Sequence, residues 1–218
     1  SAFDYYSDKK DKYATLLAAI NRKVKHYAWY RFFSFLLIFV PFLFGYNGIY
    51  TLFPSLSFLI LFFWLVKKNA RLDKLQMKYG VLKKIAEDEL LALRHSFSHF
   101  ESGNEYVDTD HFFSFDMDLF GEGSLFQFIN RTSTQSGKKK LADWLNHPPL
   151  QPGEIRGKQA AIKELAGIPG WRMHFRANGH LFHETTEMSD EIKSWSTTDL
   201  KLDNASGMKW LINLVPLF

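Results

Sequence analysis

The chain has 218 residues, a formal net charge of +4 and 46% hydrophobic residues, a composition that excludes an intrinsically disordered tail. It contains no cysteine, which excludes disulfides, thiolate nucleophiles and cysteine-type zinc sites and favours a reducing compartment. The length is sufficient for one domain or two small ones.

Apolar residues recur at helical spacing near the N-terminus and again before residue 100. Steps of four and three residues separate Tyr13, Leu17, Ile20, Val24 and Tyr27, and similar steps separate Leu72, Leu75, Tyr79 and Leu82. Both patterns predict helical seams of coiled-coil type. We expect the two helices to be antiparallel neighbours in a stalk, with the second helix ending near Phe100.

A long apolar run separates these two seams. No charged residue lies between Arg31 and Lys67, and the turn residues Gly45-Tyr46-Asn47-Gly48 interrupt the run. Splitting the run there predicts two membrane spans, 29–46 and 49–66, each about 27 Å long as a helix, against a hydrocarbon core of about 30 Å. The alternative is a hairpin buried in the core of a soluble protein.

Positive charges flank the predicted membrane hairpin on both sides, and the turn carries none. They are Lys23, Lys25, Arg31, Lys67, Lys68, Arg71 and Lys74. The positive-inside rule then places both termini and the rest of the chain in the cytoplasm, with the hairpin in the inner (cytoplasmic) membrane and lipid as its partner.

The segment that follows predicts a short strand and offers no convincing metal site. Apolar residues alternate with polar ones from Phe113 to Leu119, which predicts one strand or a strand-like arm. A calcium loop starting at Asp116 would need oxygen ligands at Phe120 and an acid at Gln127, so we expect an acidic surface loop without metal. His174, His180 and His183 do not share one helix face, and we expect no metal there either.

The stretch Ser136-Gly137-Lys138 invites comparison with a phosphate-binding loop. Such a loop needs glycine five residues before Gly137 and Ser or Thr after Lys138, but these positions hold Thr132 and Lys139. The pair Gly157-Lys158 fails in the same way. We therefore predict no phosphate loop, no catalytic residue and no cofactor site in this chain.

The same stretch follows the rules for starting a helix. Thr132 and Gln135 match a capping box, and a helix over 134–146 would bury Leu141, Trp144 and Leu145 while its lysines point elsewhere. Three later helices are predicted, with apolar faces at Ile155, Ile162 and Leu165, at Phe175, Asn178 and Phe182, and at Ile192 and Trp195. The prediction is thus an all-α fold, with a stalk and membrane hairpin over 1–100 and a helical domain over 101–218.

A series of motifs in this domain occurs in a recognisable order. It comprises a Ser-Leu helix entry, an Asn-x-Thr-x-Thr-x-x-Gly step, a basic residue, a Leu-x-x-Trp-Leu helix, a Pro-Leu exit and an Ile-x-x-Lys-Gln helix ending in Glu-Leu. The matching positions are Ser124, Leu125, Asn130, Thr132, Thr134, Gly137, Lys138, Leu141, Trp144, Leu145, Pro149, Leu150, Ile155, Lys158, Gln159, Glu164 and Leu165. Over about 50 residues, the segment resembles the core (lever) domain of the MutS mismatch-repair ATPase family.

The resemblance implies an all-α module that connects DNA-engaging parts to a dimeric ABC-type ATPase. It implies ATP, magnesium and homodimerisation only for that ATPase domain, whose motifs are missing here. The mismatch-reading Phe-x-Glu motif is not evident, and the membrane hairpin occupies the place of the mismatch-binding and connector domains. We therefore expect a membrane-anchored MutS-like paralogue, not itself catalytic and truncated before its motor.

Nucleic-acid contact is the remaining question. Lys138, Lys139 and Lys140 are the candidate contacts with DNA phosphate, although a charge run is more often a solvated face. Asn130, Thr132, Thr134 and Gly137 are expected to be structural, with the threonines as caps and the glycine allowing helices to approach closely. The alternative function is a membrane-anchored protein-interaction scaffold that does not bind DNA.

Overall fold

The computed structural model describes residues 1–43, 48–109, 111, 113–182 and 186–197. These residues form an all-helical fold without strands, as the sequence predicted. The elements are α1 (Ala2–Leu43), α2 (Ile49–Ala92), the 3-10 turn η1 (Asn104–Tyr106), α3 (Leu125–Ile129), α4 (Gln135–Asn146), α5 (Pro152–Ala166), α6 (Pro169–Leu181) and α7 (Thr186–Thr197). The described residues up to 182 belong to one compact unit, and α7 belongs to a second.

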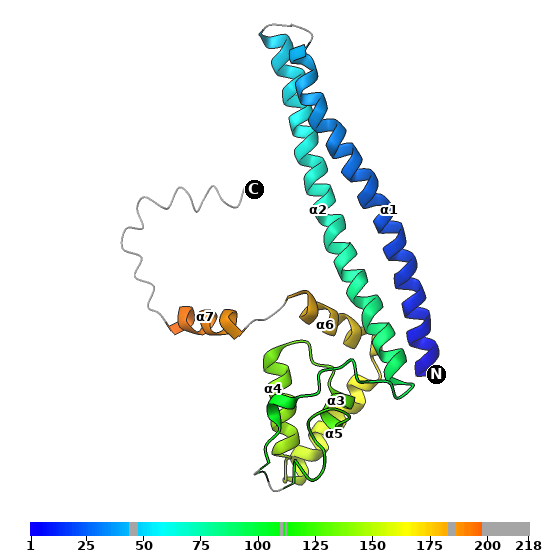
Figure 1. The fold of residues 1–218 in the computed structure, drawn as a ribbon, viewed down its shortest axis with the longest axis vertical. Coiled ribbons are helices and arrows are strands. Elements are labelled where there is room, and N and C mark those ends of the chain that lie inside the picture. The colour runs from blue at the N-terminus through cyan, green and yellow to red at the C-terminus, as the bar shows by residue number, and fades with distance from the viewer. Residues whose placement is uncertain (44–47, 110, 112, 183–185, 198–218) are drawn as a thin grey trace. The chain divides into compact units, whose positions relative to one another are not determined.

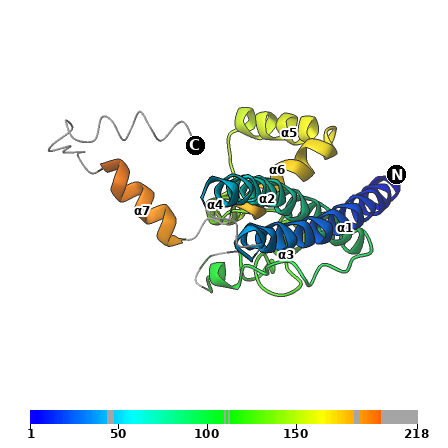
Figure 2. The ribbon, with the colours of Figure 1, turned by 90° about the horizontal axis from the view of Figure 1, so that it is seen from above.

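Helices α1 and α2 run side by side as an antiparallel hairpin (Figure 1, Figure 2). The rings of Tyr13 and Tyr79 stack with centroids 6.0 Å apart, and those of Phe35 and Phe62 lie 5.9 Å apart, which sets the register. The predicted seam of α1 is confirmed because its members are the less exposed side chains of that helix. In α2 the predicted seam member Leu75 is 40% exposed, and Gln76 takes its place on the seam. The seam continues from Leu72 by a step of four residues and not by the predicted step of three.

The far half of the hairpin exposes large apolar side chains. Phe42 is 59% exposed and Phe63 is 61% exposed. Each helix contains a segment long and apolar enough to cross a membrane. These segments include residues 29–43 and 52–66 of the predicted spans, while residues 45–47 of the predicted turn lie outside the described residues. The hydroxyl of Ser55 donates to the carbonyl of Ile38 at 3.1 Å and links the two helices.

The second helix ends earlier than predicted, at Ala92 rather than near Phe100. His95 has a φ of 60°, and the amide of Ser96 donates to the carbonyl of Leu91 at 3.0 Å. A residue in the left-handed region at this position satisfies the last carbonyls of a helix and stops its propagation. The chain therefore leaves the stalk several residues before Phe100.

The predicted strand at 113–119 is wrong, because this segment is a series of turns. The amide of Met117 donates to Phe113 O at 3.0 Å and that of Asp118 to Phe115 O at 3.1 Å. These local bonds satisfy the backbone without a partner strand. The segment leads into a small apolar core made of Leu119, Phe120, Phe126 and Ala142, with Leu141 and Leu145 packed partly buried against it.

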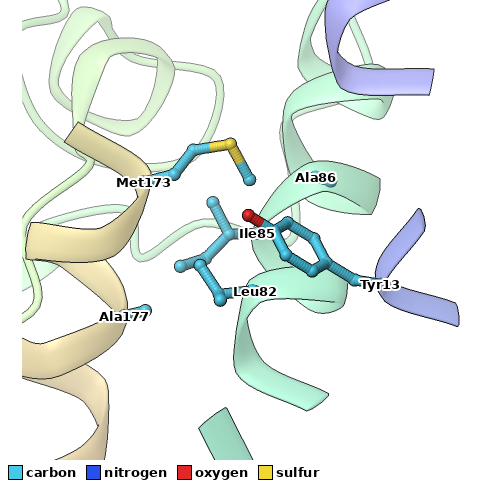
Figure 3. Packing of buried hydrophobic residues seen from close by; sticks show 6 residues of the cluster. All are labelled: Tyr13, Leu82, Ile85, Ala86, Met173 and Ala177. Carbon is cyan, nitrogen blue, oxygen red and sulfur yellow. The ribbon is translucent and has the colours of Figure 1, made fainter. Parts of the chain in front are cut away.

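Helix α6 docks on the lower part of α2 through a face that differs from the predicted one. Figure 3 shows Met173 and Ala177 facing Leu82 and Ile85, with Tyr13 of α1 in the same cluster. The predicted face is exposed, with Phe175 at 64% and Phe182 at 78%. A small side chain at the contact lets the two helices approach closely, which a row of phenylalanines would prevent.

The predicted apolar faces of α5 and α7 are not buried within the described residues. On α5 the side chains of Ile162 and Leu165 are 67% and 40% exposed, and Ile155 is half-buried. On α7 the side chains of Ile192 and Trp195 are 60% and 66% exposed. Periodicity predicted these two helices correctly. It did not predict that their apolar faces stay exposed among the described residues.

Candidate functional site

A charged cluster lies where the stalk meets the helical domain. Oε1 of Glu89, on the last turn of α2, accepts a hydrogen bond from Nε of Arg131 at 2.7 Å and from Nη1 of Arg176 at 2.7 Å. Arg131 follows α3 and Arg176 lies on α6, 42 and 87 residues from Glu89. One carboxylate thus joins three segments that are distant in sequence. We call Glu89, Phe100, Arg131 and Arg176 the junction.

Phe100 lies beneath the two guanidinium groups of the junction. Cζ of Arg131 is 3.9 Å from the centroid of its ring, and Cζ of Arg176 is 5.6 Å away. A cation over an aromatic face is stabilised by the ring quadrupole, more so when it is removed from water. Phe100 is 9% exposed, so the contact is largely dry.

Arg176 carries its charge in a largely buried position, since only 12% of its side chain is exposed. Burial lowers the pKa of Arg176 from its ordinary value, while the neighbouring Glu89 carboxylate raises it. Because an arginine pKa begins far above neutrality, the group remains a cation. The buried charge of Arg176 therefore has to be stabilised by Glu89 and Phe100 whenever α6 is docked on α2.

The Asn-x-Thr-x-Thr-x-x-Gly step forms the turn between α3 and α4. Oδ1 of Asn130, which is 5% exposed, accepts from the amide of Thr132 at 3.1 Å and from its hydroxyl at 2.7 Å. Oγ1 of Thr134 then accepts from the amide of Gly137 at 3.1 Å and caps α4. An Asx-turn followed by an N-cap explains why these residue types stand at this spacing.

Two details of this step differ from the sequence prediction. The cap is Thr134 rather than the predicted Thr132–Gln135 pair, because α4 begins at Gln135 and the Thr132 hydroxyl is engaged by Asn130. Gly137 does not mediate a close approach of helices. A Cβ there would lie 2.9 Å from Oγ1 of Thr134, so the glycine leaves room for the cap.

The three candidate lysines do not form one patch. Lys138 is 9% exposed and pairs with Glu101. Nζ of Lys140 lies 2.7 Å from Oδ2 of Asp143, and this hydrogen bond lowers the pKa of the Asp143 carboxyl. Lys139 is exposed. A helix turns by about 100° per residue, so three consecutive lysines point in three directions.

Trp144 is 45% exposed, so the expectation that it is buried among neighbouring helices is wrong. Nζ of Lys158 on α5 lies 4.4 Å from the centroid of its ring and also 2.9 Å from Oε1 of Glu154. The contact between α4 and α5 is thus a cation–π contact on a half-exposed ring. Leu141 and Leu145 face the small core, as expected.

Sequence reasoning missed two residues that hold the structure together here. Glu89 lies seven residues after Leu82, on the heptad seam of α2, where a charge is unusual and predicts a buried partner. Gln127 lies inside the apolar run Leu125–Ile129 and is 4% exposed. Its Nε2 donates to Phe100 O at 2.8 Å, and its Oε1 accepts from the amide of Gly123 at 2.8 Å.

A cavity of about 500 Å³ adjoins the junction, lined in part by Gly80, Asp88, His99, Asn130, Arg176 and His180. Nε2 of His99 is 3.6 Å from Oδ1 of Asp88. No group of three or more metal-ligating side chains is present among the described residues. The cavity therefore places polar groups of the stalk beside the Asn130 turn.

Residues 100–201 match the family model of MutS domain III. No solved structure matches the chain. The match begins at Phe100 and includes the resemblance noted in the sequence, together with α4, α5 and α6. Arg131 and Arg176 lie inside this MutS domain III-like segment, whereas Glu89 lies before it on the stalk. The junction therefore connects the helical hairpin to the MutS-like core.

Proposed function

We propose that this chain is the core (lever) module of a MutS-like protein, tethered to a membrane by the α1–α2 hairpin and without chemistry of its own. The observation that carries the proposal is the position of the junction. Glu89, at the end of a hairpin apolar enough to cross a membrane, holds two arginines of the MutS domain III-like segment. A displacement of the core would thus be transmitted to the stalk.

The apolar tip of the hairpin supports the membrane tether. Side chains such as Phe42 and Phe63 are more than half exposed, and covering such a surface with lipid removes its contact with water. Cations flank the apolar segments at the end nearer the core, while Gly48 and the neighbouring described residues at the tip are uncharged. We propose insertion into the inner membrane with both termini in the cytoplasm.

Membrane fractionation with alkaline carbonate extraction tests the tether. The full chain should stay in the membrane pellet, because a spanning hairpin is not released by washing. A variant with Phe39→Arg and Phe63→Arg, two exposed positions of the apolar tip, should move toward the soluble fraction. Recovery of the unaltered chain in the aqueous phase after detergent-free lysis would refute the tether.

Distance measurements between paired spin labels test the lever. The chain has no cysteine, so Lys83→Cys on α2 and Lys139→Cys on α4 give two unique labelling sites. The distribution of label distances should be narrow in the otherwise unaltered protein and should broaden when Glu89→Gln is added. Glu87→Gln, which removes an exposed carboxylate two residues away, should leave it narrow. Equal widths in all three proteins would show that the junction does not couple stalk and core.

A protein-interaction scaffold that does not bind DNA is the second candidate. The pairing of Lys138 with Glu101 and of Lys140 with Asp143 favours it, since paired lysines are less available to phosphate. The exposed, stacked rings of Trp171 and Phe175, 4.9 Å apart, offer apolar surface to a protein instead. Fluorescence anisotropy titrations with duplex DNA at two salt concentrations separate the candidates, because phosphate binding weakens steeply with salt.

We propose that ATP, magnesium and homodimerisation belong to a domain outside this chain. The support is the sequence, in which neither Gly-Lys pair has the spacing of a phosphate loop. In this proposal the core module supplies no catalytic residue.

A further inference from the structure

Acidic residues are missing from a long part of the hairpin. From Lys12 to Leu72 the sequence contains no aspartate or glutamate, whereas cations occur on both helices. Seven of these cations are exposed. Six of them, all but Lys12, lie nearer the apolar tip, and we call them the basic collar: Arg22, Lys23, Lys25, Lys67, Lys68 and Arg71. Such one-sided charge makes the hairpin locally strongly positive.

The register of the hairpin brings the two halves of the collar to one level. Tyr13 packs beside Tyr79, and Phe35 packs beside Phe62. The α1 cations, 22–25, and the α2 cations, 67–71, both fall between these two contacts. At about 1.5 Å per residue, each group occupies only a few ångströms along the axis. The two halves of the collar therefore lie at one level of the hairpin and not at two.

Lysines on the lower stalk differ from those of the collar. Lys83 and Lys84 pair with Glu87 and Asp88 at 3.0 and 2.8 Å. No collar side chain forms an ion pair within the part of the chain that the structure describes. Acids of the described residues therefore do not neutralise the collar, which leaves its charges open to an external anion.

Exposed aromatic rings lie directly beside the collar. Trp29 is 61% exposed and Trp64 is 55% exposed, and Nζ of Lys68 lies 5.9 Å from the centroid of the Trp64 ring. Tryptophan rings prefer the boundary between the hydrocarbon core and the headgroups. Cations one turn from such rings, on the side away from the apolar tip, would stand at the level of lipid phosphates.

We propose that the basic collar binds the headgroups of anionic phospholipids, so that the hairpin selects acidic lipid from its surroundings. The inference rests on the proposed membrane tether. Ammonium and guanidinium groups both donate to phosphate oxygens, and a juxtamembrane cluster of four to eight such cations is enough to attract acidic lipid. The lipid would also fix the height of the stalk above the membrane surface.

Tryptophan quenching by brominated lipid tests this selection on the full chain. The protein is reconstituted into phosphatidylcholine vesicles that contain a small fraction of either brominated phosphatidylcholine or brominated phosphatidylglycerol. Trp29 and Trp64 report lipid next to the hairpin. Brominated phosphatidylglycerol should quench about threefold to tenfold more effectively per molecule at low salt, and the preference should shrink as salt screens the charges.

Two variants with the same change in net charge locate the effect. Lys23→Gln, Lys67→Gln and Lys68→Gln together should abolish most of the preference. Lys83→Gln, Lys84→Gln and Lys163→Gln together should preserve it, because these lysines lie outside the collar. An equal loss in both variants would overturn the proposal in favour of a general charge effect. The salt dependence of the unaltered protein gives a second readout that needs no variant.

The remaining outcomes distinguish the collar from the tether. Equal quenching by both brominated lipids would overturn lipid selection while leaving the tether intact. No quenching by either lipid would refute the tether and the collar proposal with it. Loss of the preference on adding inorganic phosphate or duplex DNA, at ionic strength matched with sodium chloride, would show that the collar binds a soluble anion, and would also overturn the proposal.

Discussion

Glu89 and Arg176, 87 residues apart, are joined by a 2.7 Å hydrogen bond that closes α6 onto α2. Beside this bond, Met173 and Ala177 pack against Leu82 and Ile85 of α2. An apolar contact of this kind is non-directional, whereas a charge-assisted hydrogen bond is geometrically specific. The pair therefore determines the position at which the helix docks, while the apolar residues supply most of the burial.

Removing the charge of Glu89 should weaken this docking. Glu89→Gln leaves two guanidinium groups without their carboxylate, and we expect a loss of about 1.5–3 kcal/mol in the free energy of unfolding. Denaturant titration of the full chain in detergent micelles measures it. Glu87→Gln breaks only the exposed pair with Lys83 and should cost within about 0.5 kcal/mol. Equal losses in both variants would contradict the junction's role.

Phe126 and Trp144 should differ strongly in their contribution to stability. Phe126 is fully buried in the small core, and Phe126→Ala should cost about 3–5 kcal/mol. Trp144 is 45% exposed, so Trp144→Ala should cost only about 1–2 kcal/mol, from partial burial and the contact with Lys158. The same unfolding titration decides, and a Trp144→Ala loss as large as that of Phe126→Ala would show that the ring is buried.

Alanine should be tolerated at some glycine positions and not at others, depending on the backbone conformation and the space for a Cβ atom. Gly103 has a φ of 70°, and a Cβ there would lie 2.6 Å from Cδ1 of Phe126. Gly103→Ala should destabilise by about 2–3 kcal/mol through strain and overlap. Gly153→Ala meets no atom within 4 Å and should be neutral or slightly stabilising. A tolerated Gly103→Ala would mean that the loop can move away from Phe126.

Neighbouring lysines at the start of α4 should respond differently to truncation. Lys138→Ala removes a side chain that is almost entirely buried and should lower stability by about 1–2 kcal/mol through lost packing. Lys139→Ala removes an exposed side chain and should change stability within about 0.5 kcal/mol. Unfolding titrations and DNA anisotropy titrations are run on both. Salt-dependent DNA binding that Lys139→Ala weakens at unchanged stability would favour a nucleic-acid role over the scaffold.

The purified chain should not hydrolyse ATP. Thr132 stands where a phosphate loop needs glycine, and Lys139 stands where it needs Ser or Thr. Phosphate release measured with and without magnesium should remain at background in repeated preparations. Turnover that copurifies with the chain and is lost on Lys138→Ala, with folding intact, would overturn the non-catalytic proposal.

Local sequence patterns were enough to predict the helices and to recognise the resemblance of the core segment to MutS domain III. The heptad spacing of Tyr13, Ile20 and their neighbours indicated a hairpin seam, because seam residues repeat with the helix itself. The Asn130–Gly137 step was recognisable because an Asx-turn and an N-cap depend on residues only two or three positions apart. The strand predicted at 113–119 was wrong because the alternation of apolar and polar residues does not show whether a partner strand exists, and the segment forms local turns instead.

Only the tertiary structure decided which surfaces meet. Helix α6 has apolar residues on more than one side, and packing against α2 selected Met173 and Ala177 over Phe175 and Phe182. The burial of Lys138 depends on Glu101, which lies in another segment. The carboxylate of Glu89, on the seam of α2, bonds to Arg131 and Arg176, which are 42 and 87 residues away. Helix propensity acts over a few residues, whereas such contacts depend on the relative placement of whole helices, which periodicity along the chain does not determine.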